Sequence, residues 1–179
     1  MQTQVEMELR KQKSRSETIQ IRRAEEKDWT DIWAIFRSVV RSGDTYAIDP
    51  QISEADAKGL WMGNGVETFV AEVDGSRVGT FILKPNQTGP GDHVANAAFM
   101  VSGEARGRGV GEAMGRQATE LARSSGYRAM QFNSVVSTNT GAIRLWERLG
   151  FEIVGTVPGA FRDPDEGDVD VFVMHRAVV

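Results

Sequence analysis

The chain has 179 residues, of which 40% are hydrophobic and 26% charged, and its formal net charge is -4. A chain of this length suits one domain with its own hydrophobic core. Because it contains no cysteine, disulfides, thiolate nucleophiles and cysteine-ligated metals are excluded. The acidic balance argues against nucleic acid as the main partner, and two widely spaced histidines, His93 and His175, make a metal site unexpected.

Membrane and targeting segments are not expected either. No apolar run approaches the ~20 residues of a membrane span, and the N-terminus lacks the apolar core of a signal peptide. We therefore expect a cytoplasmic enzyme without membrane contact. Residues 1–17 are polar and charged and form an expected extension, which either contributes to a homodimer or has no role. The domain itself is expected to cover residues 18–179.

The first elements of the domain are predicted to be a strand and a helix. Ile19 and Ile21 alternate with polar residues, as in a strand. Asp28 stands where its side chain can cap a helix over residues 29–41. The apolar residues of this helix recur at helical spacing and are expected to be buried: Trp29, Ile32, Trp33, Phe36, Val39 and Val40.

A loop, a short helix and a β-hairpin are predicted next. Residues 42–51 are typical of a loop and residues 53–62 of a short helix. The apolar runs 68–73 and 78–83 predict two strands, and Asp74-Gly75 between them is a strong hairpin signal.

The rest of the chain predicts four strands and two helices. Strands over 93–101 and 127–136 enclose a helix over 112–124, which makes a β-α-β crossover. A helix follows over 140–149, and the last strands, 151–157 and 169–175, are separated by a Pro/Gly/Asp-rich connector over 158–168. Antiparallel strands with one crossover and flanking helices predict a mixed α/β layer structure.

Residues 106–111, Arg-Gly-Arg-Gly-Val-Gly, lie between a strand and a helix. Free N–H groups at a helix N-terminus bind phosphate, and glycines allow the main chain to approach it closely. A P-loop is excluded because Gly111 is followed by Glu112, and a dinucleotide fingerprint lacks its third glycine. The segment therefore predicts a pyrophosphate site in which Arg106 and Arg108 supply charge. A solvated surface charge is the alternative for either arginine.

A second motif starts at Asn139 and ends with Leu149-Gly150-Phe151. Ala142 stands three residues after Asn139, and a predicted amphipathic helix separates the two ends of the motif. Together with Arg-x-x-Gly-x-Gly at residues 106–111, this pattern resembles the GCN5-related N-acetyltransferases, over roughly residues 18–176. The resemblance implies an α/β fold with a mixed central sheet of about six or seven strands flanked by helices. It also implies a splayed parallel strand pair at the cofactor site.

The same resemblance implies how acetyl-CoA is held. Main-chain groups of the strand ending in Phe99, Met100 and Val101 would pair with the pantetheine arm. The pyrophosphate would lie on the main-chain N–H groups of residues 106–111: Arg106, Gly107, Arg108, Gly109, Val110 and Gly111. Asn139 would bond the pantetheine arm, although a residue just ahead of a helix also serves as an N-cap.

The chain departs from the family pattern at catalysis. Many members carry a tyrosine as general acid where this chain has Trp146, whose indole does not release its proton. Many also carry a glutamate on the strand that reads His93–Val101 here, which holds no carboxylate. Tyr46 in the first loop, Asn96 as an orienting amide and His93 as a proton acceptor are therefore the catalytic candidates.

The acceptor is expected to be a primary amine on a small molecule or an amino acid. Asn96 and Asn133 lie in neighbouring strands and either contact the acceptor or are satisfied by each other or by backbone hydrogen bonds. Their spacing also resembles, more distantly, that of fungal acetyltransferases acting on small cyclic imino acids, in which asparagines help to hold the substrate. Arg162 would pair with a substrate carboxylate or with the nearby Asp163 or Asp165.

The predicted reaction is direct attack of the amine on the thioester in a ternary complex. No covalent enzyme intermediate is expected, since the chain has no cysteine and shows no Ser-His-Asp signature. A protein or peptide N-acetyltransferase is the rival within this class. From other classes, a CoA-binding regulator with weak catalysis and, more remotely, a nucleotide-binding oxidoreductase are the alternatives.

Overall fold

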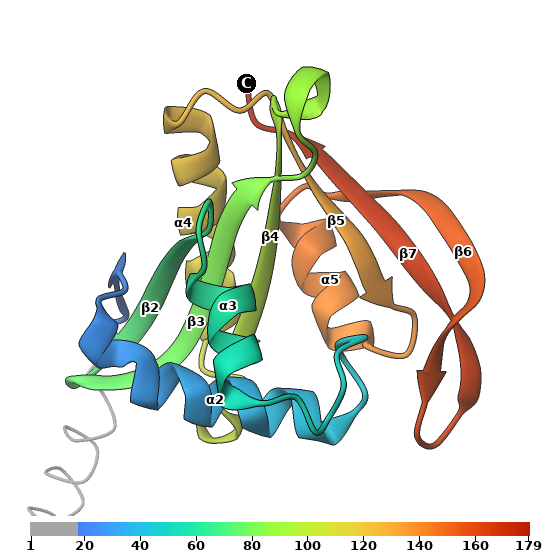
Figure 1. Cartoon of the computed structure of the whole chain (residues 1–179). Coiled ribbons are helices and arrows are strands. Elements are labelled where there is room, and N and C mark those ends of the chain that lie inside the picture. Colours follow the sequence, from blue (N-terminus) through green and yellow to red (C-terminus); the bar gives the residue numbers. More distant parts are fainter. Residues whose placement is uncertain (1–17) are drawn as a thin grey trace, which may run out of the picture.

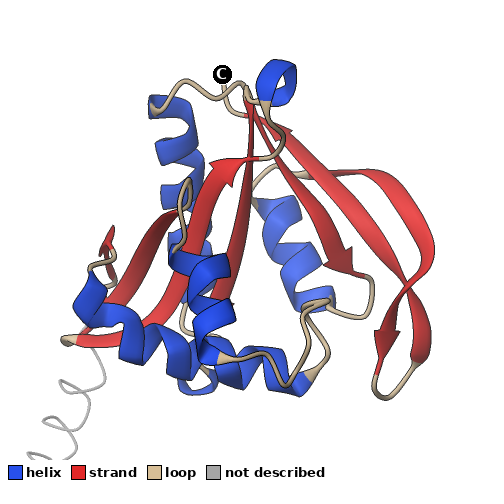
Figure 2. Cartoon of the chain, viewed as in Figure 1, coloured by secondary structure: helices blue, strands red, loops and turns tan. Residues whose placement is uncertain are grey.

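A computed structural model of the chain describes residues 18–179, in which seven strands form one mixed sheet. The order across the sheet is β1-β2-β3-β4-β5-β7-β6 (Figures 1 and 2). The expected α/β sheet of about six or seven strands is therefore confirmed. The strands are β1 (Gln20–Arg23), β2 (Glu67–Val73), β3 (Ser76–Pro85), β4 (Val94–Val101), β5 (Ala129–Val136), β6 (Glu152–Asp163) and β7 (Gly167–Ala177).

Four helices cover the two faces of the sheet. One face carries α2 (Trp29–Ser42) and α3 (Glu54–Met62), and the other carries α4 (Val110–Ser124) and α5 (Thr140–Arg148) (Figure 1). Short 3-10 turns occur at η1 (Glu26–Asp28), η2 (Gly89–Gly91) and η3 (Gly103–Ala105). The predicted β-α-β crossover is β4-α4-β5, and its two strands run parallel.

The strands β4 and β5 separate soon after they meet. Only Val94 with Ala129 and Ala95 with Met130 are in parallel register. Just beyond them, the Asn96 side chain donates a hydrogen bond to the main-chain oxygen of Gln131 at 2.9 Å. From there the ribbons diverge towards their C-terminal ends, below which α2 ends (Figure 1). The expected splayed pair is present, and its closed end is held by an amide side chain.

The two β-hairpins differ in how well they were predicted. In the β2–β3 turn, Asp74 and Gly75 have φ of 50° and 79°, as a two-residue hairpin requires. The predicted connector over 158–168 is wrong, because β6 continues to Asp163 and β7 begins at Gly167. Pro158 lies in the stretch between Val157 and Phe161 where the β6–β7 register shifts, and β6 is an edge strand, where proline is tolerated.

The N-terminus of α2 is stabilised in a way that the sequence did not indicate. Asp28 is completely buried and makes no side-chain cap bond, so the expectation of a capping aspartate is wrong. Its carboxylate instead binds the Arg22 guanidinium at 2.7 and 2.8 Å and the Arg77 guanidinium at 3.0 Å. It also accepts the main-chain N–H of Glu25 at 2.8 Å. Asp28 therefore ties α2 to strands β1 and β3.

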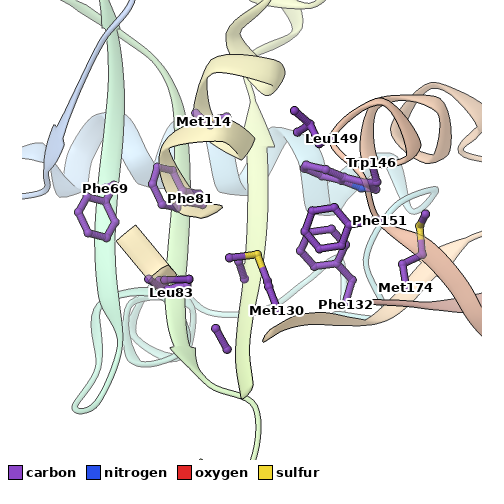
Figure 3. Packing of buried hydrophobic residues seen from close by; sticks show 14 of the residues in the cluster. Phe69, Phe81, Leu83, Met114, Met130, Phe132, Trp146, Leu149, Phe151 and Met174 are labelled. Atoms are coloured by element: carbon purple, nitrogen blue, oxygen red, sulfur yellow. The ribbon is translucent and has the colours of Figure 1, made fainter. Parts of the chain in front are cut away.

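The hydrophobic core has two main parts, one on each face of the sheet. The cluster beneath α2 and α3 includes most of the residues predicted for the first helix, although Trp33 is only partly buried. The cluster beneath α4 and α5 is rich in aromatic rings, with Trp146 close to Phe132 and Phe151 (Figure 3). This second cluster fills the side of the sheet from which α5 covers the gap between β4 and β5 (Figure 1).

Candidate active site

A cavity of about 930 Å³ opens where the glycine-rich loop, β4 and the start of α5 meet. It is bounded on its other sides by the loop after α2 and by the β6–β7 turn. The residues that line it include five of the six predicted loop residues, all three predicted β4 residues, and Asn139: Phe99, Met100, Val101, Arg106, Gly107, Gly109, Val110, Gly111 and Asn139. The structure therefore brings the predicted cofactor residues together around one cavity.

The glycine-rich loop exposes its main chain to this cavity. Gly107 and Gly109 have φ of 74° and 81°, and a Cβ atom at either would meet nothing within 4 Å. Gly109 precedes the first turn of α4 and supplies no side-chain cap. The first N–H groups of α4 have no partner within the helix and are turned towards its N-terminal end. This arrangement fits an anion such as a pyrophosphate, because open main chain, helix dipole and cavity coincide.

The two arginines of the loop lie on different sides of it. Arg106 lines the cavity, and its positive charge is among the groups that lower the pKa of Asp44, after the hydroxyls of Ser42 and Thr45. Arg108 instead lines a separate hollow between α2 and the β2–β3 hairpin. Of the two arginines, only Arg106 therefore lines the cavity at the glycine-rich loop.

The main chain of β4 presents alternate residues to its two neighbours. The Val94 oxygen accepts the N–H of Asn86, and the Ser102 N–H donates to the Val78 oxygen. The main-chain groups of even-numbered residues therefore point towards β3. The His93 oxygen accepts the N–H of Arg128, so the main-chain groups of odd-numbered residues point towards β5. Both backbone groups of one strand residue point to the same side. Phe99 and Val101 can therefore offer main-chain groups to the gap, whereas those of Met100 face β3 in register with Thr80.

Side-chain hydrogen bonds fix Asn139 and its neighbour Thr138 at the start of α5. The Asn139 side-chain oxygen accepts the N–H of Ala142 at 3.2 Å, so the predicted N-cap is present. The preceding residue, Thr138, donates its hydroxyl to the buried carboxylate of Asp163 at 2.9 Å. Asp163 also accepts the N–H groups of Asp165 and Glu166, which bind it to the β6–β7 turn and lower its pKa. The sequence showed no signal for this link between distant segments.

Tyr46 reaches from the loop after α2 to the main chain of β4. Its hydroxyl donates to the Phe99 oxygen at 2.7 Å and accepts the Phe99 N–H at 2.9 Å. Burial raises the pKa of the phenol, an effect that the Phe99 hydrogen bond only partly offsets. The phenol is therefore neutral at physiological pH and cannot act as a resident base.

Asn96 and Asn133 belong to a chain of amide side chains at the closed end of the strand gap. Asn133 donates to the side chain of Asn86 at 2.7 Å and accepts from the side chain of Gln131 at 2.8 Å. Asn96 donates to the main chain of Gln131, not to Asn133. The two asparagines therefore do not bond each other: Asn96 makes the backbone hydrogen bond that was the alternative, and Asn133 bonds two other amide side chains.

His93 and Arg162 lie away from the cavity. His93 precedes β4 at the end where β4 and β5 are paired, and Arg162 is an exposed residue of β6. The Arg162 guanidinium is 3.5 Å from Asp168, rather than next to Asp163 or Asp165. Neither residue lines the cavity described above.

Trp146 is part of the aromatic core and does not line the cavity. Its ring centroid is 4.8 Å from that of Phe99. It is 4.7 Å from that of Phe132, which lies beside it in Figure 3. Its neighbour Leu145 lines the cavity instead. The helix α4 packs close to this ring, since a Cβ at Gly115 would approach Trp146 to 3.0 Å. The position therefore shows the packing contacts expected of a structural residue.

Comparison with known proteins identifies relatives along most of the chain. The acetyltransferase (GNAT) family model matches residues 22–151. The N-acetyltransferase aca1 of Schizosaccharomyces pombe is 30% identical over 151 residues, which is 75% of this chain and 72% of the relative. A GCN5-related N-acetyltransferase from Kribbella flavida is 48% identical, with a TM-score of 0.86 over 89% of this chain and 97% of that one.

A more distant structure shares the fold. The phosphinothricin acetyltransferase of Sinorhizobium meliloti, solved in complex with acetyl-CoA, gives a TM-score of 0.80 at 24% identity. The similarity covers 89% of this chain and 88% of that protein.

A splayed parallel strand pair beside a glycine-rich helix N-terminus defines an acyl-CoA-binding transferase. The matches over most of the sequence make the assignment specific: the chain belongs to the acetyltransferase (GNAT) family. It is an acetyl-CoA-dependent N-acetyltransferase, with acetyl-CoA as its co-substrate. The family assignment drawn from the two sequence motifs is confirmed.

Two further features concern the described residues alone. Across residues 18–179, no helix is both long enough and apolar enough to cross a membrane. The same part of the chain contains no cluster of three or more histidine, aspartate or glutamate side chains arranged to hold a metal ion.

Proposed function

We propose that this protein acetylates the primary amine of a small molecule or an amino acid by direct attack on acetyl-CoA. The observation that carries the proposal is the cavity that joins the open glycine loop to the gap-facing main chain of β4. Acetyl-CoA supplies the activated acetyl group, and the amine nitrogen forms the new C–N bond as the thiol leaves. The chain's contribution is to orient both reactants and to polarise the reacting carbonyl.

The cofactor-holding roles are assigned to groups that line the cavity. N–H groups of the loop and of the first turn of α4 would bind the pyrophosphate, with Arg106 as its charge partner. Gap-facing main-chain groups of Phe99 and Val101 would pair with the pantetheine arm, and Asn139 would contact it from α5. Arg108 and Met100 would act indirectly, by shaping the loop and the strand.

We assign the acceptor amine to the face of the sheet that carries α2 and α3, beside the gap between β4 and β5. Asn96 lies on this face because Ala95 and Ala97 pack beneath α4 and α5, and side chains alternate along a strand. Asn133 does so by the same argument, because Phe132 packs in the opposite cluster. Amides both donate and accept hydrogen bonds, so these uncharged side chains suit the polar groups of a small amine or an amino acid.

The acceptor class is tested by measuring thiol release from acetyl-CoA with a panel of amines. The panel contains amino acids, polyamines, aminoglycosides and short peptides, each at the same concentration. We expect the highest kcat/KM with a member of the small-molecule group. Faster turnover of peptides would replace the proposal by protein N-acetylation, and acetyl-CoA binding without turnover of any amine would favour a regulator.

The proposed role of Asn96 predicts a selective loss in acceptor use. Asn96→Ala should raise the KM for the acceptor about tenfold, the loss of roughly one hydrogen bond. The Kd for acetyl-CoA should stay nearly unchanged, because the Asn96 side chain does not line the cofactor cavity. Steady-state kinetics and calorimetry measure the two quantities. Equal losses for both ligands would mean that Asn96 only clamps β4 to β5 through Gln131.

The proposed route for the amine proton is ordered water, with Asn96 orienting the water or the amine. The pH profile of kcat/KM should then follow the ionisation of the amine itself. His93→Gln tests the alternative base. Disappearance of an acidic limb in this variant would make His93 the proton acceptor, despite its position outside the cavity.

Trp146→Phe should keep most of the activity. The ring packs against Phe99 and Phe132, and an indole does not donate its proton at physiological pH. A smaller ring should lower the melting temperature modestly while kcat changes less than about fivefold. If kcat fell about a thousandfold in a folded variant, Trp146 would have a chemical role worth about 4 kcal/mol.

A further inference from the structure

The hydroxyl of Tyr46 occupies both gap-facing main-chain groups of Phe99. It donates to the Phe99 oxygen at 2.7 Å and accepts the Phe99 N–H at 2.9 Å. These are the groups that β4 would otherwise offer to a ligand entering the gap, because even-numbered residues of the strand face β3. One side chain thus satisfies a donor and an acceptor that a strand partner would satisfy in a closed sheet.

The segment that carries Tyr46 is hydrogen-bonded to the sheet through this hydroxyl, and its apolar side chains Ile48 and Ile52 pack against the core beneath α2 and α3. Within residues 18–179, the other hydrogen bonds of residues 44–52 are local, such as those from Thr45 to Asp44 and from Ile52 to Asp49. Gly43, with φ of 71°, ends α2 just before the segment and is tolerant of backbone rotation. Asp44 and Thr45 line the same cavity as Phe99. Release of Tyr46 would therefore remove the hydrogen bonds between the sheet and a segment that borders the cofactor site.

We propose that the Tyr46 hydroxyl occupies part of the acetyl-CoA site by bonding the main chain of Phe99. When acetyl-CoA binds, it must displace this hydroxyl from Phe99. This inference rests on the proposed placement of the pantetheine arm beside Phe99. Before binding, the phenol keeps the part-buried main-chain groups of Phe99 satisfied and the two strands apart. On binding, the ligand takes over these groups, and the released phenol stays next to the reacting end of the gap. Acetyl-CoA binding is thereby coupled to a movement of residues 44–52, which lie on the α2 side of the sheet.

The direct test is acetyl-CoA affinity in Tyr46→Phe, measured by calorimetry. The variant keeps the ring and removes both hydrogen bonds, so acetyl-CoA no longer has to break them. We expect a Kd about three- to tenfold lower than that of the unmodified protein. An unchanged or higher Kd would overturn the proposal, because it would make Tyr46 a structural pin or a ligand contact. Tyr127→Phe is the matched control and should bind as the unmodified protein does.

A ligand without the pantetheine arm separates competition at Phe99 from a general effect on the site. Adenosine diphosphate carries a pyrophosphate and no group that reaches β4. Its Kd should be the same in Tyr46→Phe and in the unmodified protein. A parallel gain for adenosine diphosphate would show that the substitution alters the glycine loop instead of removing a competitor, and would reject the inference.

A spectroscopic measurement follows the hydroxyl in the unmodified sequence and does not depend on how well a variant folds. The chain has two tyrosines, so fluorotyrosine labelling gives two 19F signals, assigned with Tyr127→Phe. Saturation with acetyl-CoA should shift the Tyr46 signal and leave the Tyr127 signal in place. Saturable binding with an unmoved Tyr46 signal would refute the displacement alone. Absence of any acetyl-CoA binding by the folded protein would refute the proposed cofactor site as well.

Discussion

Replacement of Gly109 by aspartate is expected to weaken acetyl-CoA binding about a hundredfold, a loss of about 2.7 kcal/mol. Gly109 has φ of 81° and stands at the N-terminus of α4, where its Cβ would project into open space at the loop. A carboxylate there meets the incoming pyrophosphate with like charge and competes for the N–H groups of the first turn. Calorimetric titration with acetyl-CoA gives the change in affinity.

The matched control for this experiment is Gly65→Asp. Gly65 has a nearly identical φ of 79°, and a Cβ there also meets nothing within 4 Å, but the residue does not line the cavity. Both variants carry the strain of a left-handed residue, about 1 to 2 kcal/mol. Gly65→Asp should therefore lose stability to a similar extent and keep its affinity. An unaltered Kd in folded Gly109→Asp would reject the loop as the pyrophosphate site.

Asp28→Asn is expected to lower the free energy of unfolding by about 2 to 3 kcal/mol at pH 7. The Asp28 side chain is fully buried between Arg22 and Arg77, whose side chains are 31% and 24% exposed. Removal of the carboxylate leaves two guanidinium groups facing an amide that cannot neutralise them. The loss is smaller than for a fully buried pair because water still reaches both arginines. Urea denaturation measures the effect.

The same residue predicts how stability depends on pH. The Arg22 guanidinium, then the Glu25 N–H and Arg77, hold the pKa of Asp28 well below its usual value. Because the folded-state pKa is the lower one, the stabilisation is complete above the unfolded-state pKa of about 4 and decreases as the pH falls below it. The stability difference between the unmodified protein and Asp28→Asn should therefore shrink between about pH 4 and pH 2.

A carboxylate on the same helix provides the control for Asp28. Asp31 lies 3.6 Å from Arg77 but its side chain is 53% exposed. Asp31→Asn should change the stability by less than about 0.5 kcal/mol, as exposed ion pairs do. A constant difference between the unmodified protein and Asp28→Asn from pH 7 to pH 2 would show that the buried charge is not the source of the stabilisation.

Local patterns in the sequence determined most elements and the position of the cofactor site. Asp74-Gly75 determined the β2–β3 turn because few residues adopt two successive positive φ angles. The apolar periodicity over residues 29–41 determined which face of α2 is buried. The glycines at 107 and 109 determined an open loop at the start of α4, since both adopt the left-handed conformation. Each of these features depends on residues that are close together in the chain.

The tertiary structure decided which groups face each other across long sequence separations. Tyr46 meets Phe99 across 53 residues, and Arg77 meets Asp28 across 49. Which main-chain groups of β4 face the gap follows from its register with β3, and a shift by one residue would exchange Phe99 for Met100. Arg106 and Arg108 are chemically equivalent in sequence, yet only the path of the loop places one at the cavity and the other behind it. Packing and strand register set these contacts, because local sequence limits backbone conformation but not the partner that a side chain finds.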